Sequence, residues 1–375
     1  MSLDGSDDDD GTSLATAFRT VGHAASVVGP GDSVYIRAGT YTEKVVLSTS
    51  GTEAAPIRIE GCPGEEVIID ADEYELIPFS YVVNLSADYN VIGNLTLQGA
   101  SGGMRIFGDH NLARFLTARY NNGTGISGYG AHHNVVEDSL AYDNYDEDDG
   151  EDADGFAWSG GEPDEVGSDN VFRRCVAYHN VDDGFDCWNS RDDLIEDCVA
   201  FENGNSTYMQ QLTGTSHTGN GNGFKGGHLS DSGTRFVRCV AFHNPMRGFV
   251  NNSGGEQEWD NNVAYDNAYG FVTYNLPSQL RNNLNHEGQL TMDDSPVLVS
   301  NSWQLGSITV SDADFQSLTP PTPPTTSTAD SPAWQGYSTS PFLKLASDSD
   351  CIDAGQDVGL PYQGVAPDLG AFESP

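Results

Sequence analysis

Four aspartates and one lysine flank three Gly-Phe pairs in the middle of the chain, and side chains of these types can bind a cation and move a proton. The pairs are Gly155-Phe156, Gly184-Phe185 and Gly223-Phe224. The charged residues beside them are Asp154, Asp182, Asp183, Asp186 and Lys225. Carboxylates held close together repel one another unless a cation lies among them. An oxygen-only ligand set suits Ca²⁺, and the sequence lacks the clustered His and Cys residues that zinc favours.

Lys225 has two interpretations. It could form a salt bridge with Asp186 that only neutralises the cluster, or it could act as a general base. A lysine base needs its pKa lowered toward the working pH, by burial or by a neighbouring cation. The chain has three lysines, Lys44, Lys225 and Lys344, beside thirteen arginines, so a lysine in the Gly-rich centre needs an explanation. We favour the base. In so acidic a chain, the aspartates could also form an ordinary solvated acidic face.

A recurring six-residue segment supplies the framework for these residues. Its copies begin at Thr117, Ser139, Cys175, Cys198, Cys239 and Asn262. The base interval is roughly 22–23 residues, with short strands and no helical stretches between copies, which predicts a parallel β-helix. A leucine-rich solenoid is the competing architecture, but its regular leucine spacing is missing. Stacked coils lie about 4.8 Å apart, so equivalent side chains should form ladders.

The predicted ladders have defined members. The aromatic ladder contains Tyr120, Tyr142, Tyr178, Phe201, Phe242 and Tyr265. The asparagine ladder, which would satisfy backbone groups at a tight turn, contains Asn122, Asn144, Asn180, Asn203, Asn244 and Asn267. Cys175, Cys198 and Cys239 share one position and should be buried. The glycine of each Gly-Phe pair should let the chain bend.

Aligning the Gly-Phe pairs predicts the contacts of the charged residues. Asp154 and Asp183 should be vertical neighbours on consecutive coils, as should Asp186 and Lys225. Two insertions, residues 145–153 and 205–220, both fall between an asparagine and the next Gly-Phe pair. They should therefore bulge from one side of the solenoid and bracket a groove there.

We expect one domain with three parts. Residues 1–90 form an N-terminal cap and the first coils, 91–290 the regular coils with the active-site face, and 291–375 a C-terminal strap and tail that pack on the solenoid. Spaced apolar residues predict a capping helix over 12–28, with Ser13 as its N-cap.

The amino-acid composition argues against some classes of binding partner. The formal charge of −40 argues against nucleic acid and against anionic membranes. Acid spread along the whole chain indicates adaptation to high salt, which screens the repulsion. No apolar run is long enough to span a membrane. We expect a mature, exported monomer, and whether Cys62 and Cys351 pair is left open.

The central motifs resemble a known family. The run Asp154-Gly-Phe, Asp182-Asp-Gly-Phe-Asp and Gly221-Asn-Gly-Phe-Lys, on coils with Cys-Val-Ala-Phe-x-Asn, is similar to polysaccharide lyase family 9, the pectate lyase 9 group. The likeness extends from Gly11 to the tail motif Asp368-Leu-Gly-Ala-Phe. Phe185 departs from it, standing where the family often has tryptophan.

The resemblance implies a right-handed parallel β-helix that cleaves an acidic polysaccharide, polygalacturonate or a related uronate polymer, by β-elimination with Ca²⁺. It implies calcium ligands at Asp154, Asp182, Asp183 and Asp186, and a base at Lys225. Candidates for holding neighbouring sugars are Arg247, His228, Trp188 and Asn252. Two other functions stay open: a glycoside hydrolase using a carboxylate pair such as Asp182 and Asp186, and a non-catalytic carbohydrate-binding surface protein with structural calcium.

Overall fold

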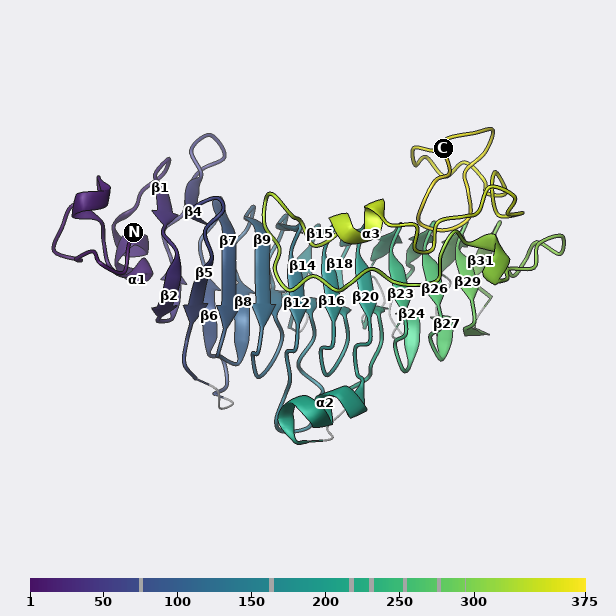
Figure 1. Cartoon of the computed structure of the whole chain (residues 1–375), viewed down its shortest axis with the longest axis horizontal. Coiled ribbons are helices and arrows are strands. Elements are labelled where there is room, and N and C mark those ends of the chain that lie inside the picture. Colours follow the sequence, from purple (N-terminus) through teal and green to yellow (C-terminus); the bar gives the residue numbers. More distant parts are fainter. Residues whose placement is uncertain are drawn as a thin grey trace.

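The repeat folds as an elongated stack of parallel β-strand coils, with the N-terminal cap and the last coils at opposite ends (Figure 1). The computed structural model describes residues 1–73, 77–161, 165–215, 219–228, 233–251, 255–274, 278–293 and 295–375. Every strand pairs in parallel with the strand one coil before or after it, as in β10 (Ile126–Tyr129) and β13 (Phe156–Ser159). The predicted parallel β-helix is therefore confirmed.

One face of the solenoid is a ten-stranded parallel sheet, called here the groove sheet. It contains β10 and β13 together with β3 (Val45–Leu47), β6 (Tyr81–Leu85), β8 (Gly102–Ile106), β17 (Phe185–Trp188), β21 (Phe224–Gly226), β24 (Arg247–Asn251), β27 (Tyr269–Thr273) and β30 (Gln289–Met292). All three Gly-Phe pairs of the central motif enter this sheet, so their flanking charged residues share one surface.

The other walls form a 19-stranded sheet with two columns. The first column contains β1 (Ser33–Ile36), β4 (Ile57–Gly61), β11 (Val135–Glu137), β15 (Val171–Arg173), β19 (Leu194–Glu196), β22 (Arg235–Val237), β25 (Glu258–Asp260), β28 (Gln279–Arg281) and β31 (Val297–Val299). The second contains β2 (Gly39–Thr42), β5 (Val67–Asp70), β12 (Leu140–Tyr142), β16 (Val176–Tyr178), β20 (Val199–Phe201), β23 (Val240–Phe242), β26 (Val263–Tyr265) and β29 (Leu284–His286). Strands β7 (Asn90–Gln98) and β9 (Leu112–Arg119) run through both columns, and β14 (Gly167–Ser168) pairs separately with β18 (Ser190–Arg191).

Helices are few among the described residues, and the N-terminal prediction needs correction. The capping segment is not one helix over 12–28 but a 3₁₀ turn, η1 (Leu14–Thr16), followed by α1 (Val21–Val27). The Asp7 carboxylate accepts hydrogen bonds from the backbone N–H of Arg19 and Thr20, which holds this part extended. Thr20, not Ser13, is the N-cap of the α-helix. The other helices are α2 (Ser206–Thr213), η2 (Asp312–Asp314) and α3 (Gln335–Thr339).

Strand register confirms the asparagine ladder from Asn144 onward and shifts its first member by one residue. Asn121, not Asn122, donates its side-chain amide to Asn144 Oδ1, at 2.9 Å. Thr117 pairs with Leu140 rather than Ser139, so Arg119 and not Tyr120 lies opposite Tyr142. The sequence pattern misled because two asparagines follow Tyr120. Each later ladder asparagine closes a turn through backbone and side-chain bonds, as Asn180 does with Asn203.

The interior is a stack of Phe rings, which accounts for the Gly-Phe pairs. Phe156, Phe185, Phe224, Phe249 and Phe271 are fully buried, with successive ring centroids 4.8–5.0 Å apart. The glycine before each ring is required by close approach rather than by a bend, which corrects our expectation. A Cβ on Gly184 would lie 2.7 Å from the carbonyl oxygen of Gly223 and 2.8 Å from the Cβ of Ala200.

The C-terminal region runs back along the second column (Figure 1). The hydroxyl of Tyr178 donates to the carbonyl of Pro324 at 2.8 Å, and that of Tyr142 donates to Thr325 at 3.1 Å. This segment and the tail cover the outward-facing aromatic ladder, where Phe342 packs edge-on against Phe242. The predicted aromatic stack thus lies outside the solenoid, under the strap.

The six cysteines are free thiols. Cys175, Cys198 and Cys239 are fully buried at one ladder position, as predicted. Cys62 follows β4 in the first coils. The carbonyl of Cys351 accepts a backbone hydrogen bond from Leu369, in the tail that packs beside the last coils, so these two cysteines do not pair. Within the described ranges, no helix is long and apolar enough to cross a membrane.

Candidate active site

The register of the groove sheet brings Lys225 beside Asp186. The two residues occupy paired positions on β21 and β17. Lys225 Nζ donates to Asp186 Oδ2 at 2.9 Å and lies 3.0 Å from Asp183 Oδ2. The lysine is 7% exposed, so this is a buried cation held by two carboxylates. The predicted vertical neighbours are thus in contact.

Three carboxylates form a tight group at this position. Asp154, Asp183 and Asp186 each offer an oxygen atom, and these atoms lie within 4.8 Å of one another. Asp183 Oδ1 accepts bonds of 2.8 Å from the backbone and side chain of Asn222. Asp154 Oδ1 accepts from the backbone N–H of Asp183 at 3.2 Å. These bonds fix one oxygen of each carboxylate from the coil above. The other oxygen of Asp183 lies 3.0 Å from Lys225 Nζ, and that of Asp154 accepts from the Thr124 hydroxyl at 3.4 Å.

Asp182 lies next to this group but is not part of it. Its side chain is buried, and its Oδ1 accepts a hydrogen bond from the backbone N–H of Asn220 at the end of the second insertion. The structure thus brings together three of the four predicted carboxylates and ties the fourth to a neighbouring loop.

The electrostatics are those of a crowded, buried acidic cluster. Burial, followed by the neighbouring charges of Asp183 and Asp154, raises the pKa of Asp182 to about 10. Burial also raises the pKa of Asp186 to about 6, against the opposing effect of Lys225. Burial disfavours the charged form of Lys225, but Asp186 and Asp183 outweigh it and raise its pKa above the ordinary value. Positive charge is therefore strongly favoured at this site.

The donor set fits a calcium ion. Asp186 Oδ1 is buried and has no hydrogen-bond partner within the described residues. A buried acceptor without a partner is costly, and a cation would satisfy it. The three carboxylates offer hard oxygen ligands, which Ca²⁺ prefers.

A groove of about 770 Å³ opens over this cluster. Its walls include Asp154, Asp186 and Lys225, and Trp188 lies on the same surface. The first insertion lines one side with acidic residues from 146 to 152, and the second contributes Asn220. Helix α2 anchors the second insertion, because Tyr208 stacks on His179 and donates to Asp143 at 2.9 Å. Both insertions thus border the groove, as predicted.

The predicted sugar-holding residues have mixed positions. Trp188 is half-buried, with its ring 5.7 Å from Lys225 Nζ, and it stacks on the exposed His228 with centroids 3.6 Å apart. Arg247 binds Asn222 Oδ1 at 3.2 Å and lies near the hydroxyl of Tyr274. Among the described groove-lining residues, neither His228 nor Arg247 is present. Asn252 lies outside the described residues.

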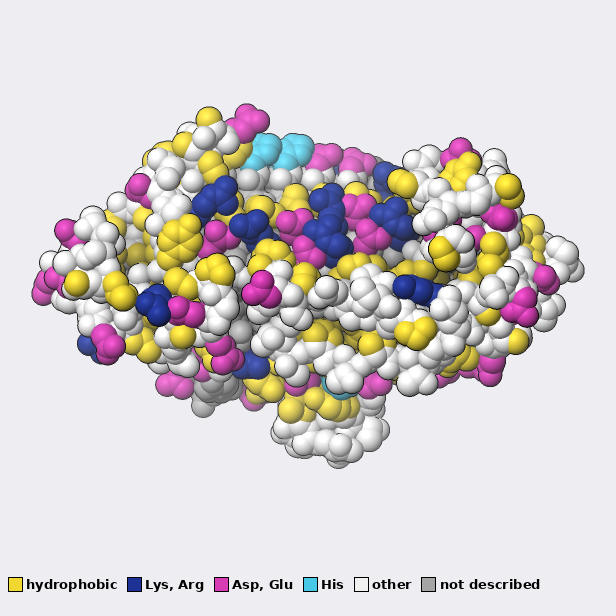
Figure 2. All heavy atoms as spheres, turned by 45° about the horizontal axis from the view of Figure 1, so that its top comes forward, with side chains coloured by type: hydrophobic (Ala, Val, Ile, Leu, Met, Phe, Trp, Pro, Cys, Tyr) yellow, Lys and Arg dark blue, Asp and Glu magenta, His cyan; other side chains and the backbone are white. Residues whose placement is uncertain are grey.

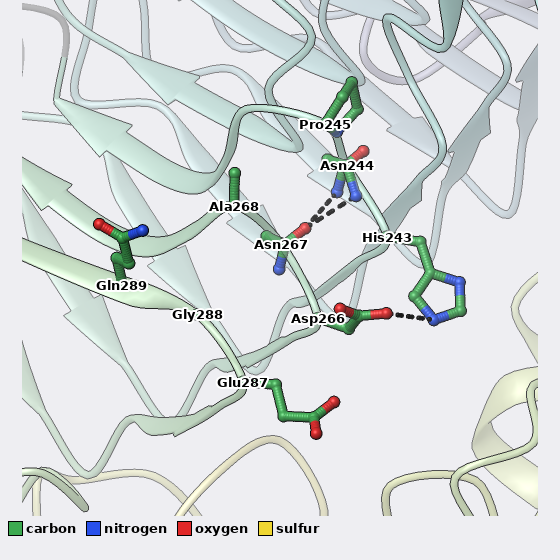
Figure 3. A pocket seen from close by; sticks show the side chains of 9 residues that line it. All are labelled: His243, Asn244, Pro245, Asp266, Asn267, Ala268, Glu287, Gly288 and Gln289. Atoms are coloured by element: carbon green, nitrogen blue, oxygen red, sulfur yellow. Dashed lines mark hydrogen bonds and ion pairs between the residues drawn. The ribbon is translucent and has the colours of Figure 1, made fainter. Parts of the chain in front are cut away.

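A second hollow lies on another edge of the solenoid, where turns meet near the last coils (Figure 3). Its lining includes His243, Asp266 and Glu287, and His243 Nε2 lies 3.4 Å from an Asp266 oxygen. It contains none of the groove residues, and its asparagines 244 and 267 are engaged in the structural ladder. The hollow is thus separate from the groove and its acidic cluster.

The sequence analysis overlooked the residues at the N-terminal end of the groove. Arg105, Tyr81 and Tyr129 line the cavity there. The sequence does contain a signal for Arg105. Gly103 and Met104 correspond to the glycine and the apolar residue of a Gly-Phe pair, and Arg105 occupies the position that follows the pair. Strand pairing aligns Met104 with Ile126 and Arg105 with Ser127.

Comparison with known proteins agrees with this geometry. A family model described as "Pel9A-like, right handed beta helix region" matches residues 1–285. Pectate lyase L of Dickeya chrysanthemi is 32% identical over 372 residues, covering 93% of this chain and 84% of the relative. Pectate lyase PEL9 of Emericella nidulans is 31% identical, covering 81% of this chain and 82% of its own.

A solved structure extends the likeness to the fold. The crystal structure of pectate lyase Pel9A superposes with a TM-score of 0.85 at 28% identity, covering 100% of this chain and 95% of that one. A rhamnogalacturonan lyase shares the fold, with a TM-score of 0.74 at 23% identity. These findings define a polysaccharide lyase built on a right-handed β-helix. The chain belongs to the Pel9A-like right-handed β-helix family.

Proposed function

We propose that the protein cleaves pectate, or a related uronate polymer, by calcium-dependent β-elimination with Lys225 as the general base. The observation that carries the proposal is the contact between Lys225 and the buried carboxylates on the floor of the groove. Pectate lyase relatives support the substrate class.

Asp154, Asp183 and Asp186 would hold the calcium ion, and Asp182, whose Oδ1 accepts from the backbone of Asn220, would lie beside them. When bound, calcium supplies positive charge that neutralises the uronate carboxylate and makes the neighbouring C5 proton more acidic. Asp183 and Asp186 would then no longer direct their full charge at Lys225, which lowers its pKa and favours the neutral amine. Asp182 and Asp154 complete the acidic set on adjoining coils.

Lys225 would remove the C5 proton, and the oxygen linked at C4 would leave, giving a 4,5-unsaturated end. The carboxylate and C5 are adjacent atoms of one sugar, so the cation ligands and the base must also be neighbours. Parallel pairing of β17 with β21 supplies this proximity, since Asp186 and Lys225 are register partners. Trp188 beside the lysine offers an aromatic face to an adjoining sugar.

The proposal extends to the protein's setting. A net charge of −40 favours a salt-rich medium, where repulsion within the protein and against a polyanionic substrate is screened. We accordingly expect a secreted, salt-adapted monomer. A thermal midpoint that rises between low and molar KCl would support this adaptation, and a midpoint that falls would oppose it.

The test is product analysis with polygalacturonate in molar salt, with calcium and with a chelator. We expect ultraviolet absorbance of an unsaturated uronate that appears with calcium and disappears with chelator. New reducing ends without that absorbance would instead indicate a glycoside hydrolase. Binding without any cleavage of uronate polymers would indicate a carbohydrate-binding protein.

A further inference from the structure

Arg105 has no acidic partner among the described residues of a very acidic protein. Its Nη1 donates to Ser127 Oγ at 3.0 Å. Its Nε is buried and has no hydrogen-bond partner, and no carboxylate of the described ranges forms an ion pair with Arg105. An unpaired, partly desolvated guanidinium is unfavourable, so this position suits an anion that arrives from outside.

Several other arginines are held by acids. At the turn between the two outer columns, Arg174 binds Asp138 at 2.6 Å and Arg238 binds Asp197 at 2.8 Å. At the ends of β28 and β25 in the first column, Arg281 binds Asp260 at 2.6 Å. Figure 2 shows cationic side chains interleaved with acidic ones on one face of the solenoid. Stacked charge pairs of this kind account for these three arginines, and Arg105 is not among them.

The surroundings of Arg105 resemble a sugar-binding shelf. Its guanidinium carbon lies 5.1 Å from the ring centroid of Tyr129, 5.8 Å from that of Tyr81 and 5.9 Å from that of Phe107. Phe79, which is 87% exposed, also lines the groove at this end. Exposed aromatic rings present flat apolar faces, and a guanidinium held among them keeps its planar fork oriented for a carboxylate.

Arg105 belongs to the same column of the groove sheet as the reacting residues. Successive register partners run from Arg105 to Ser127, Ala157, Asp186 and Lys225. Four coil spacings separate the two cations, about 19 Å along the axis. Among the described groove-lining residues, Arg105 and Lys225 are the two cations, while the wall from 146 to 152 is acidic.

We infer that Arg105, with Tyr81, Tyr129 and Phe107, forms a distal subsite that binds the carboxylate of a uronate unit several sugars away from the cleavage point. This inference rests on the proposed function, because it assumes a uronate chain in the groove. We take the polysaccharide to lie extended along the solenoid axis, with each sugar spanning about one coil spacing. The sugar at Arg105 is then about four units from the sugar at Lys225. The subsite contributes affinity for long chains and leaves the chemical step unchanged.

The experiment compares wild type with Arg105→Gln and Arg105→Lys on polygalacturonate and on trigalacturonate, which is too short to reach from Lys225 to Arg105. For Arg105→Gln we expect the polymer KM to rise about tenfold, with kcat within about twofold, because a charge-assisted hydrogen bond is lost. The kcat/KM for trigalacturonate should stay unchanged. Arg105→Lys keeps the charge without the fork, so its polymer KM should be intermediate.

Arg119→Gln is the matched control. Arg119 also lies against a tyrosine ring and donates to neutral partners, Gln98 and Tyr142, but it lies in the outer sheet, away from the groove. This variant should retain the wild-type KM for both substrates. A circular-dichroism melt of each variant tests folding. If Arg105→Gln does not fold, the polymer KM of Arg105→Lys tests the inference instead.

The outcomes separate this inference from the proposed function. A wild-type protein that forms no unsaturated product overturns the proposed function itself. An active wild type whose Arg105 variants keep the polymer KM overturns only the distal subsite. Equal losses on trigalacturonate and polymer would also overturn it, since they indicate a structural role.

Discussion

Lys225 Nζ lies 2.9 Å from Asp186 Oδ2, and the two residues are register partners on neighbouring coils. A β-helix fixes this relationship through backbone pairing rather than through loop conformation, because each strand of the groove sheet bonds to the next. The proposed proton acceptor and the proposed calcium ligand thus keep a constant separation. Four predictions follow from this arrangement and from the ladders that support it.

Calcium should stabilise the protein through Asp186. Asp186 Oδ1 is buried without a hydrogen-bond partner within the described residues, so Asp186→Asn removes a charge and an oxygen that suit the ion. Adding calcium to chelated wild type should raise the thermal midpoint, since at about 100 times the Kd a ligand adds roughly 2.7 kcal/mol. We expect Asp186→Asn to show less than half of this rise in calorimetry.

Asp266→Asn is the control for the calcium experiment, because this exposed carboxylate lies in the hollow of Figure 3 rather than in the groove. It should keep the full calcium response. A wild-type midpoint that does not change with calcium would argue against an ion at the three carboxylates.

The packing of the Gly-Phe pairs predicts that Gly184→Ala destabilises the fold. The new Cβ would lie 2.7 Å from a backbone oxygen of the next coil, which cannot move without disturbing the sheet. Overpacking typically costs about 1–3 kcal/mol, so the thermal midpoint should fall clearly. Gly306→Ala is the control, since nothing lies within 4 Å of its Cβ position. Equal midpoints for the two variants would refute the close-approach explanation.

A second polar ladder predicts a pH-dependent effect at Asp193. Asp193 Oδ1 accepts hydrogen bonds from the backbone N–H and the side-chain amide of Asn170. One coil earlier, Asn170 Oδ1 accepts the same two bonds from Asn134. Burial raises the pKa of Asp193 to about 7. The folded protein therefore keeps a proton that the unfolded chain loses near pH 4, so stability falls as pH rises from about 4 to 7.

Asp193→Asn should remove this loss. Its stability advantage over wild type should grow from pH 4 to 7 and stay constant above, reaching on the order of 4 kcal/mol. Thermal melts of both proteins across this range measure the difference. An advantage that does not change with pH would contradict a buried, titrating Asp193.

The fold and register of the central coils could be predicted from the sequence because their repeat is unambiguous. Cys-Val-Ala-Phe-x-Asn and the following Gly-Phe pair set both periodicity and register, so the contact between Asp186 and Lys225 could be predicted without coordinates. The register failed by one residue at Tyr120, where consecutive asparagines offer two equivalent alignments and only packing against Asn144 selects Asn121.

Other features depend on contacts that no local pattern encodes. The N-terminal helix begins at Val21 because the distant Asp7 carboxylate holds Arg19 and Thr20 extended. Arg105 escaped notice because Met104 replaces the phenylalanine of its Gly-Phe position, although the strand register is the same. The stacking of His228 on Trp188 likewise joins the end of β17 to the segment that follows β21 on the next coil.

The most direct test of the account is the rate of unsaturated product formation by Lys225→Ala, measured together with calcium-induced stabilisation. Lys44→Ala is the control, since Lys44 pairs with Glu73, contacts the Ser80 hydroxyl and is not among the described residues that line the groove. We predict that Lys225→Ala loses about 10²–10⁴-fold in rate, as for removal of a general base, while calcium still raises its thermal midpoint. Unsaturated product at the wild-type rate from a folded, calcium-responsive Lys225→Ala would contradict the assignment.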